Sequence, residues 1–495
     1  MSKRPTALES EHAELRTLTQ ALLASIAELN ATISELRADN AELRRLLFGR
    51  KSERVEPIER EVIRHRSSPE EKAARQAVGK DRRAANRRKK KALPEVDIEH
   101  TLGDDAACPC CASRELAPLG SDEASEEYEY VPARLVRTRH RRRKYRCEQC
   151  ETIVTAPGAA KVVDGGQYGP GLYAHVVTEK CADATPIHRL AERFRRAGVP
   201  VSRSTLTDLF HRSAELLEPL AARLLELVAS SERVNADETT LRVQARGKTR
   251  TAWLWTFLNE QAICYRFSPS RSGDTPLDVL GQTTGTLQVD AYSGYNKVCV
   301  PDGRTRVGCW AHLRRLFFKA RQTAPEPAEH AITAIRHLYE VEWDAAADKL
   351  LGTDKHLAMR KTRTADLLAE FHAWLVEEKP QHPPKSPLGE AIRYALNNWE
   401  PLARIKDDAK LPLDNNVSER ALRIVALGRK NWLFVGHDAA GENLATLMSL
   451  TATCSLHGVD PQAYLTDVLV RVATTPQSQI DELLPWNWRP PDSPE

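Results

Sequence analysis

The 495-residue sequence is long enough for about two to four domains with sizeable hydrophobic cores. Its 72 Lys and Arg residues nearly balance 68 Asp and Glu residues, so the net charge of +4 does not by itself identify a partner. No apolar run approaches the roughly 20 residues of a membrane-spanning helix, and the N-terminus lacks the apolar centre of a signal peptide. We therefore expect a cytoplasmic protein without a membrane segment.

The first 50 residues carry a seven-residue leucine repeat. Leucines recur at every seventh position from Leu8 to Leu43, and mainly apolar residues occupy the interleaved positions through the second half of the segment. This is the pattern of a coiled coil, and Asn40 at an interleaved position favours a two-stranded register. The sequence therefore predicts a leucine zipper that joins copies of the chain. An amphipathic helix packed on its own chain is the alternative.

Two basic segments follow the repeat. Residues 51–95 lose the seven-residue period and become highly charged, with the run RRKKK at 87–91. Such runs are usually solvated, and they can also hold DNA phosphates without sequence preference; the two interpretations are compatible. The second segment, RTRHRRRKYR at 137–146, indicates contact with a DNA backbone. The predicted contacts there are Arg141, Arg142 and Arg143.

Two cysteine pairs predict a zinc-binding module over residues 96–155. The first lies in CPCC at 108–111 and the second in CEQC at 147–150. Four thiolates form the tetrahedral set that a structural Zn²⁺ prefers, and the long gap between the pairs indicates a zinc-ribbon-like module. Buried free thiols are the alternative. The candidate ligands are Cys108, Cys111, Cys147 and Cys150, and Cys110 could replace either of its neighbours.

Residues 156–228 have helical periodicity. The basic segment 186–198 predicts an amphipathic helix that ends at glycine, and Ser202 or Ser204 is the expected cap of a second helix. Two helices joined by a short glycine-containing turn resemble a helix-turn-helix motif, whose second helix would enter the major groove of DNA. Plain packing of a helical hairpin is the alternative.

The region 229–320 is predicted to contain a mixed sheet. β-rich runs at 233–236, 239–244, 252–258 and 262–267 predict an antiparallel meander, with a turn just after Asp237. A short helix over 274–280 then leads to a parallel strand that ends at Asp290, and a last strand leads into the basic helix 313–320. An aspartate at the end of a buried strand is hard to explain as surface decoration.

The segment 411–436, LPLDNNVSERALRIVALGRKNWLFVG, combines an acid with a helix start, a basic cluster and a strand-like run. Asx residues before Glu419 predict the helix start, so one interpretation is a capping box in which Glu419 reaches back to the backbone N–H of Asn416. Four cations follow on and after this helix: Arg420, Arg423, Arg429 and Lys430. A carboxylate beside that many cations is also a candidate metal ligand next to a phosphate backbone.

Two strand-end aspartates and a downstream helical glutamate form the constellation of RNase H-like phosphoryl-transfer enzymes. We expect Asp237, Asp290 and Glu419 to be catalytic, with Asp237 shared between two Mg²⁺ ions, or Mn²⁺, and the other acids each completing one site. Glu238 and Asp414 are the nearest rivals. Glu238 is expected on the opposite face of its strand, and Asp414 is better explained as a cap.

Basic residues beside these acids are the predicted contacts to the scissile phosphate and its flanking backbone. They are His312, Arg314, Arg315, Arg429 and Lys430. For His312 a hydrogen-bonded core histidine is the alternative. Tyr292 and Tyr295 could stack on a flipped-out base, although a packing role is favoured.

Four motifs carry a resemblance to a known family. VNADETTLRV (234–243), LQVDAYSGYNKV (287–298), GCWAHLRRLFFKA (308–320) and DNNVSERALRIVALGRKNWLFVG (414–436) resemble those of DDE-type, TnpC-like transposases of the insertion-sequence-sixty-six family. The resemblance covers nearly the whole chain. It implies binding to transposon ends, cleavage with water and joining of the freed 3′-hydroxyl to target DNA. It also implies small companion proteins encoded beside the transposase.

The sequence thus predicts a multidomain α/β protein with an RNase H-like core. A DNA-binding regulator with a degenerate sheet, or an RNase H-like nuclease that does not join strands, are the alternative functions. The predicted segments are a coiled coil (1–50), a basic linker (51–95), a zinc-binding module (96–155), a helix-turn-helix-like region (156–228), the first part of the core (229–320), a helical insertion (321–408), the helix of the catalytic glutamate (409–436) and C-terminal helices with a tail (437–495).

Overall fold

The computed structural model describes residues 135–146, 153–199 and 201–490, together with seven positions between 19 and 32. Those seven positions are helical and exposed, and the rest of the predicted coiled coil (1–50) lies outside the described residues. So do the basic linker (51–95) and all five cysteines of the predicted zinc module: Cys108, Cys110, Cys111, Cys147 and Cys150. From residue 140 onward the described chain belongs to one compact unit.

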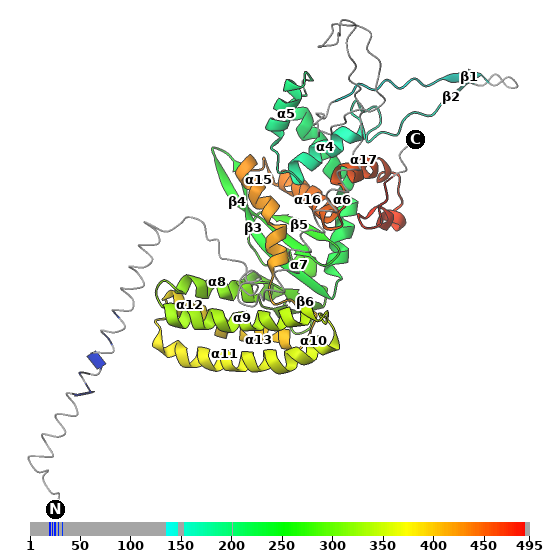
Figure 1. Cartoon of the computed structure of the whole chain (residues 1–495). Helices are drawn as coiled ribbons and strands as arrows, with labels where there is room; N and C mark the ends of the chain where they lie inside the picture. Colours follow the sequence, from blue (N-terminus) through cyan, green and yellow to red (C-terminus); the bar gives the residue numbers. More distant parts are fainter. Residues whose placement is uncertain are drawn as a thin grey trace, which may run out of the picture. The chain divides into compact units, whose positions relative to one another are not determined.

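A five-stranded mixed sheet organises this unit (Figure 1). Its strands are β3 (Arg233–Ala245), β4 (Lys248–Leu258), β5 (Ile263–Ser268), β6 (Gly285–Gln288) and β7 (Arg304–Val307). The order is β5-β4-β3-β6-β7, with β3, β4 and β5 antiparallel and with β6 and β7 parallel to β3. The helix α7 (Asp274–Leu280) lies in the connection from β5 to β6. The predicted meander, helix and parallel strand are therefore confirmed.

The first strand differs from its prediction. Instead of a strand, a turn and a second strand, β3 runs unbroken through both acids, and it pairs Asp237 with Thr256 and Glu238 with Trp255. The turn falls later, between β3 and β4, where Gly247 has a φ of +71° that glycine adopts without steric cost. Two acidic residues interrupt the hydrophobic pattern here, but the backbone pairing with β4 continues past them.

Helices from both ends of the described chain cover the sheet. These helices are α4 (Pro170–Cys181), α5 (Ile187–Arg196), α6 (Arg203–Ala229), α16 (Asp438–Leu456) and α17 (Pro461–Arg471). The helix α16 packs against β5, and α6 packs against α16, β5 and α4. The helix α17 packs against α4, so one hydrophobic core joins these elements.

The predicted helical hairpin of α5 and α6 is present. Gly198 has a φ of +78° after α5, and Ser202 caps α6 because its Oγ accepts a hydrogen bond from Thr205 N at 3.1 Å. The cap is therefore Ser202 and not Ser204. Most of the apolar side chains of α6 are buried in the shared core, whereas Arg203 in its first turn is exposed. A DNA contact by α6 stays a prediction, and it would come from this first turn.

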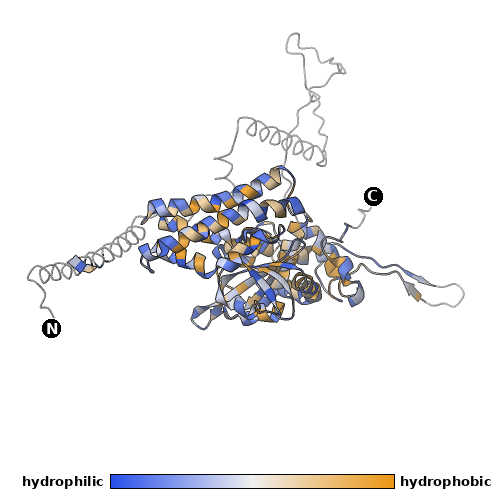
Figure 2. Cartoon of the chain, turned by 90° about the horizontal axis from the view of Figure 1, so that it is seen from below, coloured by the Kyte–Doolittle hydropathy of each residue, from blue (hydrophilic) through white to orange (hydrophobic). Residues whose placement is uncertain are grey.

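The chain between β7 and Glu419 is mainly helical, as the sequence pattern predicted for this region. Its helices are α8 (Trp310–Ala320), α9 (Pro325–Ala347), α10 (Asp354–Met359), α11 (Ala365–Glu378), α12 (Pro387–Asn397) and α13 (Trp399–Ala403), with a π-helical turn at Arg360–Thr364. They surround a hydrophobic core of their own that includes Trp310, Phe317 and Phe371. Figure 2 shows hydrophobic and hydrophilic residues together on these helices, as expected where one face is buried.

The helix predicted at Glu419 is present as two short helices, and the second continues to Trp432, into the run that was predicted to be strand-like. These are α14 (Asn416–Ala421) and α15 (Arg423–Trp432). Only Val435 joins the sheet, through an isolated parallel bridge to Val243. The apolar residues of α15 recur at helical spacing, which a short apolar run does not distinguish from a buried strand. Among all the helices of the described ranges, none is long and apolar enough to cross a lipid bilayer.

Candidate active site

Two of the predicted acids come from neighbouring parallel strands. The register of β3 with β6 pairs Asn235 with Gln288, and Asp237 and Asp290 each follow two residues later. Residues two apart on an extended chain point to the same face, so this register places Asp237, within β3, beside Asp290, which lies two residues beyond the end of β6. Asp290 Oδ1 accepts a hydrogen bond from Tyr292 N at 2.9 Å, which fixes the turn directly after the strand.

The charge environment of Asp237 links it to the other two acids. Burial is the main cause that raises the pKa of Asp237 to about 7. A hydrogen bond from Glu238 N at 2.8 Å opposes this rise, while the charges of Glu238, Asp290 and Glu419 add to it. The charges of Asp290 and Glu419 thus both act on the Asp237 carboxylate.

A buried asparagine holds the helix of Glu419 against β3. Asn415 is 5% exposed; its Nδ2 donates to the Ala236 carbonyl oxygen at 2.7 Å, and its Oδ1 accepts from Asn235 Nδ2 at 2.9 Å. Ala236 directly precedes Asp237, so these bonds join the first turn of α14 to the strand position beside the first acid. The sequence predicted that Asn415 lies at a helix start, where Asx side chains usually cap the helix. It did not predict a contact with β3.

The capping box, one of the two interpretations of Glu419, is absent. The N-cap of α14 is Asn415, and no side chain accepts a hydrogen bond in the capping position. Glu419 instead accepts a hydrogen bond from Arg315 Nη2 at 2.7 Å through its Oε1. The side chain of Asp414 accepts from Asn416 N at 3.0 Å, which is the local turn-forming role expected of a residue that begins a helix. Glu419 therefore faces the cations of α8.

Glu238 belongs to a separate group of contacts. Its side chain is 2% exposed, and it accepts hydrogen bonds from Arg271 Nη2 at 2.6 Å and from the Tyr295 hydroxyl at 2.7 Å. The Arg271 guanidinium lies 4.0 Å from the ring centroid of Tyr292, and Tyr295 is fully buried. Tyr295 thus has the packing role that the sequence favoured.

The cations predicted beside the acids have different surroundings. His312 stacks on Tyr394 with 5.6 Å between ring centroids; burial lowers its pKa, and the charges of Asp290 and Glu419 oppose this. Arg314 is only 5% exposed, so its position offers little support for a phosphate contact. Arg315 bridges to Glu419, as described above.

The remaining predicted DNA contacts lie elsewhere. Arg429 Nη1 donates to the carbonyl oxygen and the hydroxyl of Thr240, both at 2.7 Å, so this guanidinium ties α15 to β3. Lys430 is exposed. The strand β1 (Lys144–Arg146) pairs with β2 (Ile153–Thr155). Three exposed arginines directly precede β1: Arg141, Arg142 and Arg143.

The donor set at the three acids suits a hard divalent cation. Carboxylate oxygens are the ligands that Mg²⁺ prefers, and a bound cation would offset the burial and the neighbouring negative charges that raise the pKa of Asp237. Within the described ranges, however, no three His, Cys, Asp or Glu side chains gather closely enough to form a ready-made metal site. In this structure Glu419 is instead paired with Arg315 at 2.7 Å.

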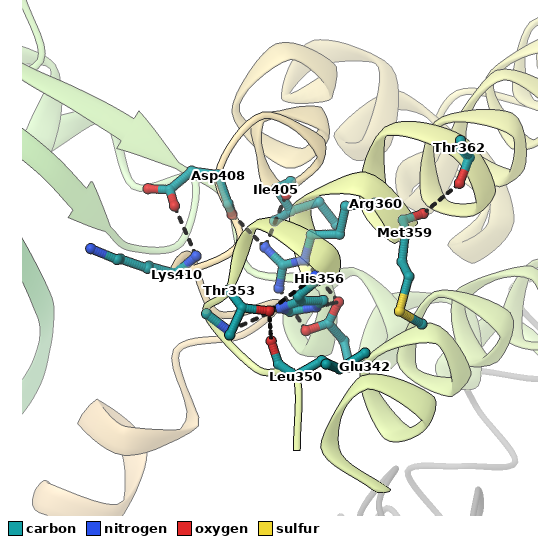
Figure 3. A network of polar contacts seen from close by, with 11 residues as sticks. Glu342, Leu350, Thr353, His356, Met359, Arg360, Thr362, Ile405, Asp408 and Lys410 are labelled. Atoms are coloured by element: carbon teal, nitrogen blue, oxygen red, sulfur yellow. Dashed lines mark hydrogen bonds and ion pairs between the residues drawn. The ribbon is translucent and has the colours of Figure 1, made fainter. Parts of the chain in front are cut away.

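A buried polar network in the helical insertion holds the chain that leads to α14 (Figure 3). Arg360 is 1% exposed; its Nη1 donates to the carbonyl oxygens of Ile405 at 2.9 Å and Asp408 at 2.6 Å. Its Nε and Nη2 donate to the carboxylate of Glu342 at 2.8 and 2.6 Å. His356 also contacts Glu342, at 3.1 Å. The sequence gives no sign of this network, because charged residues on a predicted helix are usually solvated.

Comparisons with known proteins agree along most of the chain. The model of the transposase IS66 family matches residues 165–443, that of the IS66 C-terminal element matches 449–486, and that of the zinc-finger binding domain of transposase IS66 matches 105–151. The uncharacterized protein y4hP of Sinorhizobium fredii is 32% identical over 486 residues, which cover 90% of this chain and 87% of the relative. Its counterpart y4qI is also 32% identical, with 98% and 94% covered.

Proposed function

Since the chain belongs to the IS66 family of transposases, we propose that it binds the ends of an insertion sequence, cuts them and joins them to target DNA. Asp237, Asp290 and Glu419 are the catalytic acids of this proposal. The observation that carries it is the shared charge environment of the three carboxylates, which come from two parallel strands and a helix far apart in sequence.

The sheet supports an RNase H-like core. Its three antiparallel strands are followed by two parallel strands on the other side of the first, which is the arrangement of that fold. Asp237 on the first strand and Asp290 after the fourth then lie where such a core carries its acids. The helical insertion follows the fifth strand, and α14 returns Glu419 to the sheet through Asn415.

Each residue of the site has a separate role in the proposed phosphoryl transfer. Asp237 would be the ligand shared by two Mg²⁺ or Mn²⁺ ions, with Asp290 and Glu419 each completing one site. Such ions supply charge stabilisation for the attacking and leaving oxygens of an in-line displacement. His312, on the first turn of α8, would contact the scissile phosphate, because the charges of Asp290 and Glu419 reach it. The exposed Lys430 and the exposed arginines at 141–143 would hold the flanking DNA.

Arg315 has a second role in this proposal. Its ion pair with Glu419 is more than a third exposed on both sides, and such pairs contribute only about 0–1 kcal/mol. A DNA phosphate can therefore draw Arg315 away from Glu419. The exchange would free the carboxylate for a metal ion at the moment when the substrate arrives, and it would couple DNA binding to completion of the site.

The exchange predicts a gain in metal binding without DNA. In Arg315→Met, Glu419 keeps no guanidinium partner from α8, so the DNA-free protein should bind Mn²⁺ up to about fivefold more tightly, while DNA cleavage falls. Electron paramagnetic resonance of free Mn²⁺ measures the affinity. Arg321→Met is the control, because it removes a similarly exposed ion pair, with Glu329, from the same segment. Equal Mn²⁺ affinity in wild type and Arg315→Met would exclude the exchange.

The zinc-finger match at 105–151 supports a structural Zn²⁺ on the cysteine pairs. Removal of zinc by a chelator should unfold this module locally and weaken DNA binding at least about tenfold, because the basic segment at 137–146 loses its support. Zinc content by atomic absorption and an electrophoretic mobility-shift titration measure the two effects. Cys147→Ser should lose zinc, whereas Cys110→Ser should keep it if Cys108 and Cys111 are the ligands. Full DNA affinity in zinc-free protein would contradict this role.

The other parts of the proposal concern assembly. The leucine repeat at 1–50 would join two copies of the chain, so that two ends of an element are held together. Small companion proteins of the same element would be further partners. We also propose the segment boundaries given above, including a helix-turn-helix-like region at 156–228.

One assay tests the function directly. Full-length protein is incubated with Mg²⁺ and DNA that carries the ends of its own element, and the cuts are mapped together with any joined products. Cuts at the element ends with transfer to a target duplex are expected. Cutting without joining would indicate an RNase H-like nuclease, and end binding without any cut would indicate a DNA-binding regulator; either result would overturn the proposal.

A further inference from the structure

Glu238 is a buried acid that has no role in the proposed chemistry, although it directly follows Asp237. The strand β3 runs extended through both acids, so their side chains point to opposite faces of the sheet. Asp237 shares its face with Asn235, which contacts Asn415 before the helix of Glu419. Glu238 points the other way, and its side chain is 2% exposed. A carboxylate buried to this degree costs free energy unless it is paired, so its partners indicate its role.

One partner of Glu238 comes from the segment that carries Asp290. Beyond Asp290 the chain forms a short 3-10 helix, Ser293–Lys297, and the hydroxyl of Tyr295 within it donates to Glu238 Oε2 at 2.7 Å. The Tyr295 ring also packs edge-on against Trp255 of β4, with 5.7 Å between ring centroids. The hydrogen bond therefore ties the chain just after the second acid to the strand that carries the first.

The other partner of Glu238 reaches the same segment closer to Asp290. Arg271, in the loop before α7, donates to Glu238 Oε1 from its Nε at 2.8 Å and from its Nη2 at 2.6 Å. Its guanidinium lies over the ring of Tyr292, and its backbone carbonyl oxygen accepts a hydrogen bond from the Tyr292 hydroxyl. Tyr292 N in turn donates to Asp290 Oδ1. A continuous set of contacts thus leads from the Glu238 carboxylate to the Asp290 carboxylate.

We propose that Glu238 is a positioning residue, which holds the segment of Asp290 against β3 and so sets the place of the Asp290 carboxylate relative to that of Asp237. Both oxygens of Glu238 are engaged in this task, through Tyr295 and Arg271. Groups that orient metal ligands in this way commonly decide metal affinity. The inference rests on the proposed function, because a shared cation is what requires the two aspartates to be held together.

Tyr295→Phe tests the proposal, because it removes the hydroxyl that donates to Glu238 and keeps the ring. In full-length protein without DNA or metal, amide hydrogen exchange of residues 290–297 should become faster, as measured by mass spectrometry. Arg306 of β7 also holds this segment, through the Tyr292 carbonyl oxygen and Asn296, so the segment should loosen without being released. Affinity for Mn²⁺ should fall about tenfold, the low end of the loss that follows when a group orienting a metal ligand is removed. Electron paramagnetic resonance of free Mn²⁺ measures this affinity.

Tyr464→Phe is the matched control. Tyr464 is equally buried, and its hydroxyl also donates at 2.7 Å, to the carbonyl oxygen of Leu483 outside the candidate site. We expect wild-type Mn²⁺ affinity in this variant and wild-type exchange at 290–297. A purely structural role of the Tyr295 hydroxyl would lower the unfolding temperature of both variants and leave the Mn²⁺ affinity of the folded proteins the same.

Glu238→Gln separates a positioning residue from a metal ligand. Its single acceptor oxygen cannot serve both Tyr295 and Arg271, so exchange at 290–297 should rise and Mn²⁺ affinity should fall in this variant as well. Lost Mn²⁺ binding in Glu238→Gln together with wild-type binding in Tyr295→Phe would make Glu238 a ligand and overturn the inference. Unchanged exchange at 290–297 in folded Tyr295→Phe would overturn it too, even if the wild type cleaves DNA. Faster exchange in a protein whose wild type cuts no DNA would refute the proposed function and leave the contact between Glu238 and this segment standing.

Discussion

Replacing Asp237 or Asp290 by asparagine, or Glu419 by glutamine, should reduce cleavage of element ends at least about a thousandfold and leave binding of those ends near wild type. Each amide keeps the size of the acid but removes the charge that a divalent cation needs. A thousandfold loss corresponds to about 4 kcal/mol of activation free energy. Gel analysis of cut strands measures the rate, and an electrophoretic mobility-shift titration measures binding to the ends.

Two controls separate lost chemistry from lost folding. Asp302→Asn removes an exposed carboxylate in the turn before β7 and should cleave normally. Asp237→Asn should unfold at a temperature no lower than wild type in the absence of metal, because burial and neighbouring charges already oppose the ionised form of Asp237. Near-normal cleavage by any one of the three amide variants would remove that residue from the proposed catalytic set.

Much of the fold was predictable because its signals are local. The strands of the meander have β-favouring composition, and the crossover helix at 274–280 has the bounds of the observed α7. The cap at Ser202 follows from the same kind of local pattern. The errors occur where a long-range partner decides the structure. Pairing with β4 carries β3 straight through Asp237 and Glu238, where the sequence alone indicated a turn.

The acids of the candidate site could be proposed from the sequence, but the contacts that hold them could not. An acid at the end of a buried strand stands out in a sequence, which is why Asp237 and Asp290 could be singled out. The contacts of Glu419 depend on α8, more than a hundred residues earlier, so the sequence offered a capping box in place of the ion pair with Arg315. The sequence placed Asn415 only within a helix start at 414–416, and its bond to the Ala236 carbonyl group depends on the tertiary fold.

The largest effect outside the acids is expected at Arg360. Its guanidinium is buried and donates hydrogen bonds to the Glu342 carboxylate and to two backbone carbonyl groups between α13 and α14. Arg360→Met would leave the Glu342 charge without this partner and would remove the side-chain donor from both carbonyl groups, although Asp408 O would still accept from Leu411 N at 3.3 Å. Breaking one side of a buried ion pair typically costs about 3–5 kcal/mol. We expect a loss of this size in the free energy of unfolding from urea titration.

The position of the Arg360 network implies that its variants also lose DNA cleavage activity. The backbone that Arg360 holds at Ile405 and Asp408 leads directly to the turn at Asp414, and Tyr339 of the same insertion donates to Asp414 Oδ2 at 2.9 Å. Arg360→Lys keeps the charge but cannot reproduce the forked hydrogen bonds, so it should lose cleavage even under conditions in which it remains folded. Arg363→Met is the matched control, because this arginine is exposed and its ion pair with Asp344 lies near the surface, so its loss should cost about 1 kcal/mol or less. Wild-type stability in Arg360→Met would mean that the insertion does not hold the helix of Glu419 in this way.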